Sequence, residues 1–95
     1  MDFIFEVDDK NGKKIRLTQR QYSHMLRRHA YMHKYIEEIK KTIMKPDKLI
    51  FSNFKGYYYK GYKDLKSPNR FIVVVVRYLN NHGFVLTSYA EKNIL

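Results

Sequence analysis

Cysteine is absent from the 95 residues of this sequence. Disulfides, thiolate zinc sites and cysteine nucleophiles are therefore excluded. Long apolar runs are missing too, since no stretch approaches the ~20 residues that a helix needs to span a bilayer. The opening stretch MDFIFEVDD carries acids where a secretory signal needs positive charge. We therefore expect a cytoplasmic protein without a membrane segment.

Acidic side chains are scarce, because 9 Asp and Glu stand against 19 Lys and Arg, which gives a formal net charge of +10. None lies between Lys10 and Ile36, and Asp64 is the only one between Lys48 and Ala90. Such an excess of one sign repels itself in a folded chain, so it favours an anionic partner, most directly RNA. A generally basic surface without a specific partner is the alternative.

Familiar metal and phosphate motifs are also missing. The sequence has no HExxH, no glycine-rich phosphate loop and no paired-carboxylate motif. His29 and His33 have no nearby carboxylate or thiol that would complete a tetrahedral zinc site. We therefore predict neither a metal site nor a cofactor.

Two periodicities indicate the fold. Alternating apolar residues on either side of Asn11-Gly12, a strong turn signal, predict a β-hairpin over residues 1–17. Apolar residues at spacings of three and four then predict one long helix over residues 18–44, which Pro46 ends.

The remaining segments have the composition of strands. Short β-prone runs separated by turn residues predict an antiparallel sheet over residues 48–90, with an apolar central strand at residues 71–76. The chain is therefore expected to form a single α+β domain over residues 1–95, with the helix packed on this sheet.

Candidate catalytic residues lie first on the predicted helix. At 100° per residue, His29 lies near the centre of the apolar stripe and should face the sheet. Arg28 should lie at the rim of the cleft, and His24 lies farther round the helix. A core histidine bonded to a backbone carbonyl is the alternative for His29.

The last predicted strand adds hydroxyl groups. Thr87 and Tyr89 share one face by the period of two, together with Val85. If that face lies under the helix, a hydroxyl and a phenol approach the imidazole of His29. Both residues are also ordinary strand formers, which is the alternative.

Further basic and aromatic side chains are candidates for binding RNA, by contact with phosphates or by stacking on bases. These candidates are Arg27, Tyr58, Lys60 and Arg77.

Five pieces occur in a characteristic order between about residues 22 and 94. They are His24-x-x-x-Arg28-His29, Ile39-x-x-x-Ile43 leading into Lys45-Pro46-Asp47, Tyr57-Tyr58-Tyr59-Lys60, Val73-Val74-Val75-Val76 and Val85-Leu86-Thr87-Ser88-Tyr89. In this order the sequence resembles the barnase/EndoU/colicin/RelE-like nuclease superfamily, and particularly its small phage- and toxin-associated branch.

The resemblance implies a metal-independent endoribonuclease that uses a helix histidine, a neighbouring basic residue and a Ser/Thr-x-aromatic pair on a late strand. These roles match His29, Arg28, Thr87 and Tyr89, with His24 as a second histidine. The family's basic residue on a middle strand is less fixed, and Lys60 and Arg77 are candidates for it. The superfamily also includes members that have lost catalysis.

Three functions therefore stay open. The first is an RNase, such as the toxin of a toxin–antitoxin or phage-related system, that cleaves RNA through its own 2′-hydroxyl. The second is a non-catalytic RNA-binding module that uses basic and tyrosine side chains. The third is a protein whose charge meets an acidic, antitoxin-like chain. The sequence leaves the oligomeric state undetermined.

Overall fold

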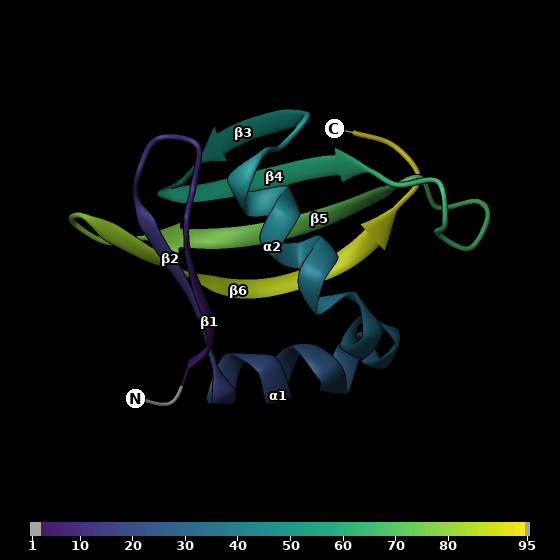
Figure 1. The fold of residues 1–95 in the computed structure, drawn as a ribbon, viewed down its shortest axis with the longest axis horizontal. Coiled ribbons are helices and arrows are strands. Elements are labelled where there is room, and N and C mark those ends of the chain that lie inside the picture. The colour runs from purple at the N-terminus through teal and green to yellow at the C-terminus, as the bar shows by residue number, and fades with distance from the viewer. Residues whose placement is uncertain (1–2, 95) are drawn as a thin grey trace.

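Six strands and three helical segments follow one another in the computed structural model, which describes residues 3–94. They are β1 (Phe3–Asp8), β2 (Lys14–Thr18), α1 (Gln19–Arg28), the 3-10 helix η1 (Ala30–Tyr35), α2 (Ile36–Met44), β3 (Lys48–Ser52), β4 (Lys55–Gly61), β5 (Phe71–Tyr78) and β6 (His82–Glu91). The α+β class is confirmed, with the predicted N-terminal hairpin and C-terminal antiparallel strands (Figure 1). No helix within residues 3–94 is long and apolar enough to cross a membrane.

All six strands belong to one sheet, in the order β1-β2-β6-β5-β4-β3. The predicted antiparallel sheet over residues 48–90 is confirmed as a meander from β3 to β6, and the N-terminal hairpin joins it through a parallel pairing of β2 with β6. That pairing was not predicted, and it involves only the start of β6, from His82 to Phe84. Beyond Phe84 the outer edge of β6 is not paired with β2, and α1 packs beside it (Figure 1).

The single helix predicted over residues 18–44 is in fact broken. It begins as expected, because the Thr18 side chain accepts a hydrogen bond from the amide of Gln21 at 3.1 Å. His29 ends α1 with φ −135° and ψ 63°, outside the helical region. Met25 and Met32 are both fully buried on either side of the break. A continuous apolar pattern is thus compatible with two helices that dock separately, which is why periodicity could not reveal the break.

The sheet has two unlike faces. On one face α2 crosses β4 and β5 and covers the larger core (Figure 1). Ile39, Ile43, Tyr58 and Val74 are all 0% exposed there. On the other face Val73 and Tyr59 form a smaller buried cluster that contains residues of the strands and of the C-terminal segment, and none from a described helix.

A buried carboxylate fixes the N-terminal hairpin to the rest of the sheet. Asp9 Oδ1 accepts hydrogen bonds from the amides of Asn11 and Lys13, both at 2.9 Å, so it closes the hairpin turn. Its other oxygen accepts a hydrogen bond from the Tyr58 hydroxyl at 2.8 Å. The hairpin is thereby linked to β4, which lies three strands away in the sheet.

Candidate active site

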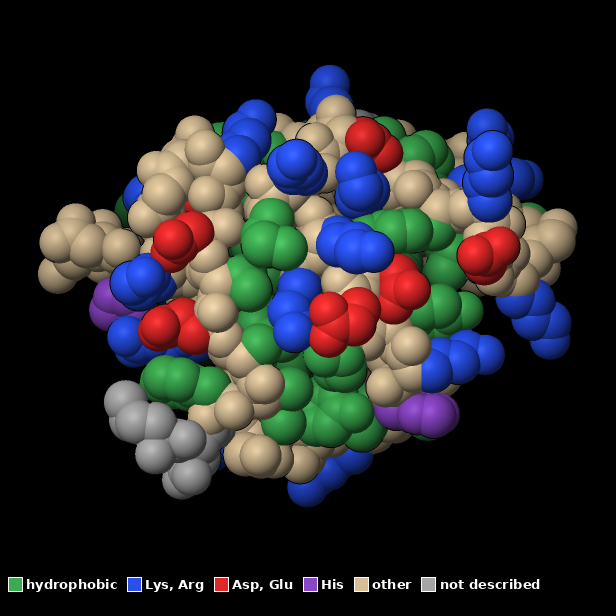
Figure 2. Space-filling model, in the orientation of Figure 1, with side chains coloured by type: hydrophobic (Ala, Val, Ile, Leu, Met, Phe, Trp, Pro, Cys, Tyr) green, Lys and Arg blue, Asp and Glu red, His purple; other side chains and the backbone are tan. Residues whose placement is uncertain are grey.

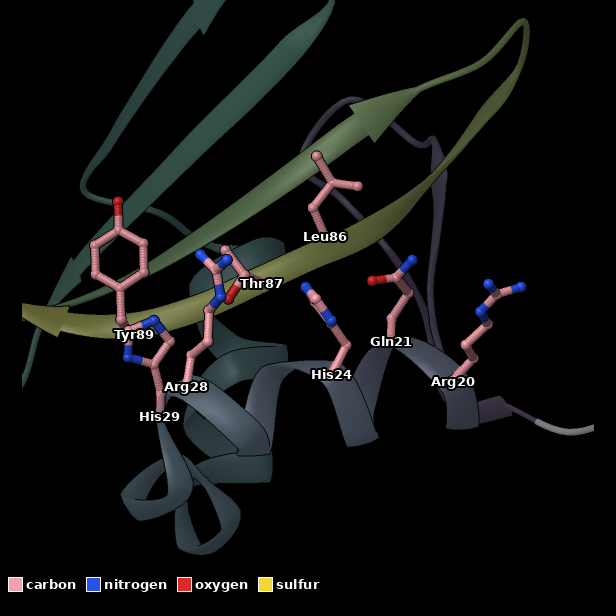
Figure 3. Close-up of a pocket in the computed structure, with 8 residues that line it drawn as sticks. All are labelled: Arg20, Gln21, His24, Arg28, His29, Leu86, Thr87 and Tyr89. Atoms are coloured by element: carbon pink, nitrogen blue, oxygen red, sulfur yellow. The ribbon is translucent and has the colours of Figure 1, made fainter.

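A cleft of about 600 Å³ opens between α1 and the part of β6 that lies beyond its pairing with β2 (Figure 3). Its lining residues are Arg20, Gln21, His24, Arg28, His29, Leu86, Thr87 and Tyr89. The five residues predicted to be catalytic therefore lie together in one cavity, with the helix residues on one side and the strand residues on the other.

Helix α1 contributes a row of cationic and imidazole groups. Arg20, His24 and Arg28 are spaced four residues apart, so they lie along one side of the helix. Met25, on another side, is fully buried in the core and holds α1 in place. His24, which lies farther round the helix than His29 but which the resemblance implied as a second histidine of the site, also lies in the lining. Arg20 was not predicted at all, although the spacing of four could have indicated it.

His29 reaches the cleft because it ends the helix. Its backbone amide donates a hydrogen bond to the carbonyl of Met25 at 2.8 Å, while its φ of −135° turns the chain away from the helix axis. The imidazole lies beside the ring of Tyr89, with 5.5 Å between the ring centroids, and contacts Tyr31 edge-on at 6.1 Å. Burial, and secondarily the Arg28 guanidinium, lower the pKa of His29 below its usual value of 6.5.

The opposite wall comes from β6, which contains a β-bulge. Val76 pairs with Val85 and Val75 with Thr87, so Leu86 is an extra residue in β6. Val85 consequently lies in the core on the α2 face, whereas Tyr89 packs against the cluster on the opposite face. The expectation that Val85 shares a face with Thr87 and Tyr89 is therefore wrong, because a strict period of two does not hold across the bulge.

Two side chains of β6 that carry hydroxyl groups, Thr87 and Tyr89, line the cleft opposite the helix. Thr87 Oγ1 is buried and has no hydrogen-bond partner among residues 3–94. A buried hydroxyl without a partner costs free energy, so its presence calls for an explanation, and a catalytic or ligand-binding role is one. Burial is the main cause that raises the pKa of Tyr89, so its phenol stays a hydrogen-bond donor at neutral pH.

All the ionisable groups that line the cleft, apart from the Tyr89 phenol, are basic. Among the described residues that form the cleft there is no Asp or Glu, while two arginines and two histidines face it. An anion that enters meets fixed guanidinium groups suited to bidentate contact with phosphate oxygens. Within residues 3–94 no group of three or more His, Asp or Glu side chains is arranged to hold a metal ion.

The residues predicted to bind RNA are dispersed. Arg27 is exposed on α1 but is not part of the cleft lining. Lys60 lies by its register on the α2 face, where its ammonium donates to the carbonyl of Lys45 at 3.0 Å. Arg77 is exposed and pairs with Phe84, which places it on the same face as Thr87 but outside the cleft.

Tyr58, also predicted to contact RNA, is instead a core residue. Its side chain is 0% exposed, and its hydroxyl donates to Asp9 and interacts with the hydroxyl of Tyr78. Burial and these two hydrogen bonds raise the pKa of Tyr58 far above its ordinary value. An aromatic run such as YYYK cannot reveal which ring faces solvent, because adjacent strand residues point to opposite faces.

Comparison of the chain with protein-family models, with curated proteins and with solved structures gives no match. Its function is therefore inferred from the chemistry of the cleft.

Proposed function

We propose that this protein is a metal-independent endoribonuclease of the barnase/EndoU/colicin/RelE-like type. The observation that carries the proposal is the lining of the cleft, where His24, His29, Arg28, Thr87 and Tyr89 converge without a carboxylate. Imidazoles can transfer protons, and guanidinium groups can stabilise charge on a phosphoryl group. RNA supplies the nucleophile itself, because its 2′-hydroxyl is adjacent to the scissile phosphate.

The proposed reaction uses one histidine as base and the other as acid. The lowered pKa of His29 keeps its imidazole neutral near pH 7, so it accepts the proton of the 2′-hydroxyl. The 2′-oxygen forms a bond to phosphorus while the bond from phosphorus to the 5′-oxygen breaks. His24, elsewhere along the same cleft, donates a proton to the departing 5′-oxygen. The products are a 2′,3′-cyclic phosphate and a 5′-hydroxyl.

The other lining groups act on the phosphate. Arg28 binds two phosphoryl oxygens through its planar guanidinium and stabilises the charge that grows in the transition state. Thr87 Oγ1, which has no partner among the described residues, donates a hydrogen bond to the same group. Tyr89 packs beside His29 and holds the imidazole in place.

The setting of this activity is part of the proposal. The net charge of +10 and the resemblance to toxin-associated nucleases support a cytoplasmic enzyme that is restrained by an acidic antitoxin or inhibitor. Expression of the protein alone should inhibit growth of the host cell. Co-expression with the product of a neighbouring gene should restore growth, and this result would test the pairing.

The reaction is tested with purified protein and single-stranded RNA in excess EDTA. Cleavage should persist, leave 2′,3′-cyclic phosphate ends and spare DNA of the same sequence. One 2′-deoxy substitution at the scissile position should block cleavage there alone. A requirement for added Mg²⁺ or Zn²⁺, or equal cutting of DNA, would contradict the proposal.

Two histidine variants give a matched control. His29→Ala should lower the cleavage rate by roughly 10²–10⁴-fold, the usual contribution of an acid–base group. His33→Ala removes an exposed imidazole from η1, outside the cleft, and should leave the rate unchanged. If both variants lost the same fraction of the cleavage rate, with unchanged circular dichroism, His29 would not be a catalytic residue.

A non-catalytic RNA-binding module is the second candidate. One observation favours it: the face of the sheet without a helix carries partly exposed Tyr57, with Lys55 and Arg77 paired to each other on the same face. Stacking on Tyr57 and phosphate contacts with the two cations could hold a single strand. RNA binding that weakens steeply with salt and in Tyr57→Ala, without any cleavage by the native protein, would favour the module.

A further inference from the structure

A second cavity, of about 280 Å³, lies beside the cleft, between η1 and the loop that joins β4 to β5. Its walls include Tyr31, Lys34 and Tyr35 from η1, and Leu65, Lys66 and Asn69 from the loop. None of these residues has a role in the proposed proton transfer.

Tyr31 separates the cavity from the cleft. Its ring contacts His29 edge-on, at a centroid distance of 6.1 Å and an interplanar angle of 78°. Its hydroxyl accepts a hydrogen bond from the amide of Ala90 at 2.9 Å. Because Ala90 lines the cavity and the preceding Tyr89 lines the cleft, the two spaces are one residue apart along β6.

The chemistry of the walls suits a nucleotide. Tyr31 and Tyr35 offer aromatic rings, and Leu65 adds an apolar surface. The side-chain amide of Asn69, a half-buried residue, has no hydrogen-bond partner within residues 3–94, although its backbone amide donates to the carbonyl of Lys66 at 3.0 Å. The ammonium of Lys34 lies 5.5 Å from the Tyr35 ring centroid, so a cation stands next to the aromatic surface.

We propose that this cavity binds the base of the nucleotide next to the scissile phosphate. Tyr31 stacks on the base, Asn69 pairs with its edge, and Lys34 and Lys66 hold the adjoining backbone phosphate. We assign Asn69 to the Hoogsteen edge of the base, where an amide forms two hydrogen bonds with N6 and N7 of adenine but meets only the O4 acceptor of uracil, so the site favours adenine over uracil. The inference rests on the proposed function, since the site gives cleavage its base preference.

Binding of an uncleavable ligand tests the inference separately from catalysis. A set of 2′-deoxy-substituted tetranucleotides carries adenine, uracil or an abasic residue at each position in turn. At one position adenine should bind more tightly than the abasic residue, by about 5- to 150-fold, as for a base stacked on an aromatic side chain. Isothermal titration at low salt gives the affinities.

Matched variants assign the effect to the cavity. Asn69→Ala should remove the difference between adenine and uracil, whereas Asn81→Ala, an exposed amide in the β5–β6 turn, should keep it. Tyr31→Ala should weaken binding of every base, and Tyr31→Phe should retain the stacking and most of the affinity. Circular dichroism shows whether each variant is folded.

The outcomes separate the two proposals. If native protein binds the adenine, uracil and abasic ligands equally at every position, the base-binding site is refuted, whether or not RNA is cleaved. If adenine dependence is present and is lost in Asn69→Ala, the site is supported even when the protein fails to cleave RNA. In that case only the enzymatic proposal fails.

Discussion

The two faces of the sheet differ in whether their polar side chains have hydrogen-bond partners within the protein. On the α2 face even polar groups are engaged, since the Tyr58 hydroxyl bonds to Asp9 and Thr42 Oγ1 bonds to the carbonyl of Glu38. Where the opposite face meets α1, Thr87 Oγ1 is buried without a partner among residues 3–94, and two arginines face a cleft. The polar groups of the α2 face therefore stabilise the fold, whereas the candidate site lies where a hydroxyl and two guanidinium groups remain available to a ligand.

The distribution of charge follows the same division. Figure 2 looks onto the α2 side, where acidic side chains lie among the basic ones over α2 and the N-terminal hairpin. Glu37 there pairs with Lys40 at 3.0 Å, and Glu6 pairs with Arg16 at 2.6 Å. The described residues that line the cleft include no acid, so a polyanion that enters the cleft meets no carboxylate there.

Two adjacent arginines provide the sharpest test of this division. Arg28 lines the cleft and Arg27 does not, although both are exposed at the end of α1. Arg28→Ala should lower kcat/KM for RNA cleavage by roughly 10²–10³-fold, as expected for a group that stabilises transition-state charge. Arg27→Ala should lower kcat/KM by no more than one phosphate contact contributes to RNA binding. Losses of equal size would mean that general charge matters rather than the cleft.

Two adjacent tyrosines test the stability side of the comparison. Tyr58→Phe deletes a hydroxyl that donates to the buried Asp9 carboxylate, so the free energy of unfolding should fall by about 1–3 kcal/mol. Tyr57→Phe lies on the opposite face and should change it by less than about 0.5 kcal/mol. Urea denaturation at one pH measures both. A larger cost for Tyr57→Phe would reverse the assignment of the two faces.

Much of the fold could be predicted because its signals are local. Asn11-Gly12 marks the hairpin turn, and the apolar run at residues 71–76 marks the central strand. The parallel pairing of β2 with β6 could not be predicted, since it joins residues far apart in sequence and has no turn to mark it. The break at His29 was missed because neither glycine nor proline occurs there.

The site was predictable in part, for a similar reason. Helical spacing and strand parity bring Arg28, Thr87 and Tyr89 together, and the structure places them in one cleft. The helix angle alone would not have joined His24 to His29, because the side chain of His29 leaves the helix where α1 ends; His24 was predicted from the resemblance, and it also lines the cleft. Tyr58 was misplaced because no sequence rule chooses which ring of YYYK enters the core.

The turn between β3 and β4 belongs to neither face, so a change there should affect stability alone. Asn53 and Phe54 have φ values of 52° and 64°, and the Phe54 side chain is 84% exposed. Left-handed backbone costs a non-glycine residue about 1–2 kcal/mol, and the extra unfolded-state entropy of glycine offsets about 0.5–1 kcal/mol of that. Phe54→Gly should therefore raise the free energy of unfolding by up to about 1 kcal/mol. Asn53→Gly should gain less, because asparagine tolerates this conformation.

The smallest effect expected is on proton binding at His29. Burial and then Arg28 lower its pKa, so the acid limb of kcat/KM should lie below pH 6.5, where the base becomes protonated. The native state binds this proton less readily than the unfolded chain, so stability should decline as the pH falls from 6.5 toward the lowered pKa. Arg28→Ala removes the one charged neighbour within residues 3–94 that lowers this pKa, and an NMR titration of the His29 ring should show the pKa rising toward 6.5. The Tyr89 ring contacts the imidazole, and burial raises the pKa of Tyr89, so this neighbour is uncharged in this range. An unchanged or lower pKa in Arg28→Ala would mean that the guanidinium points away from His29, and Arg28 could then no longer share a phosphate with it.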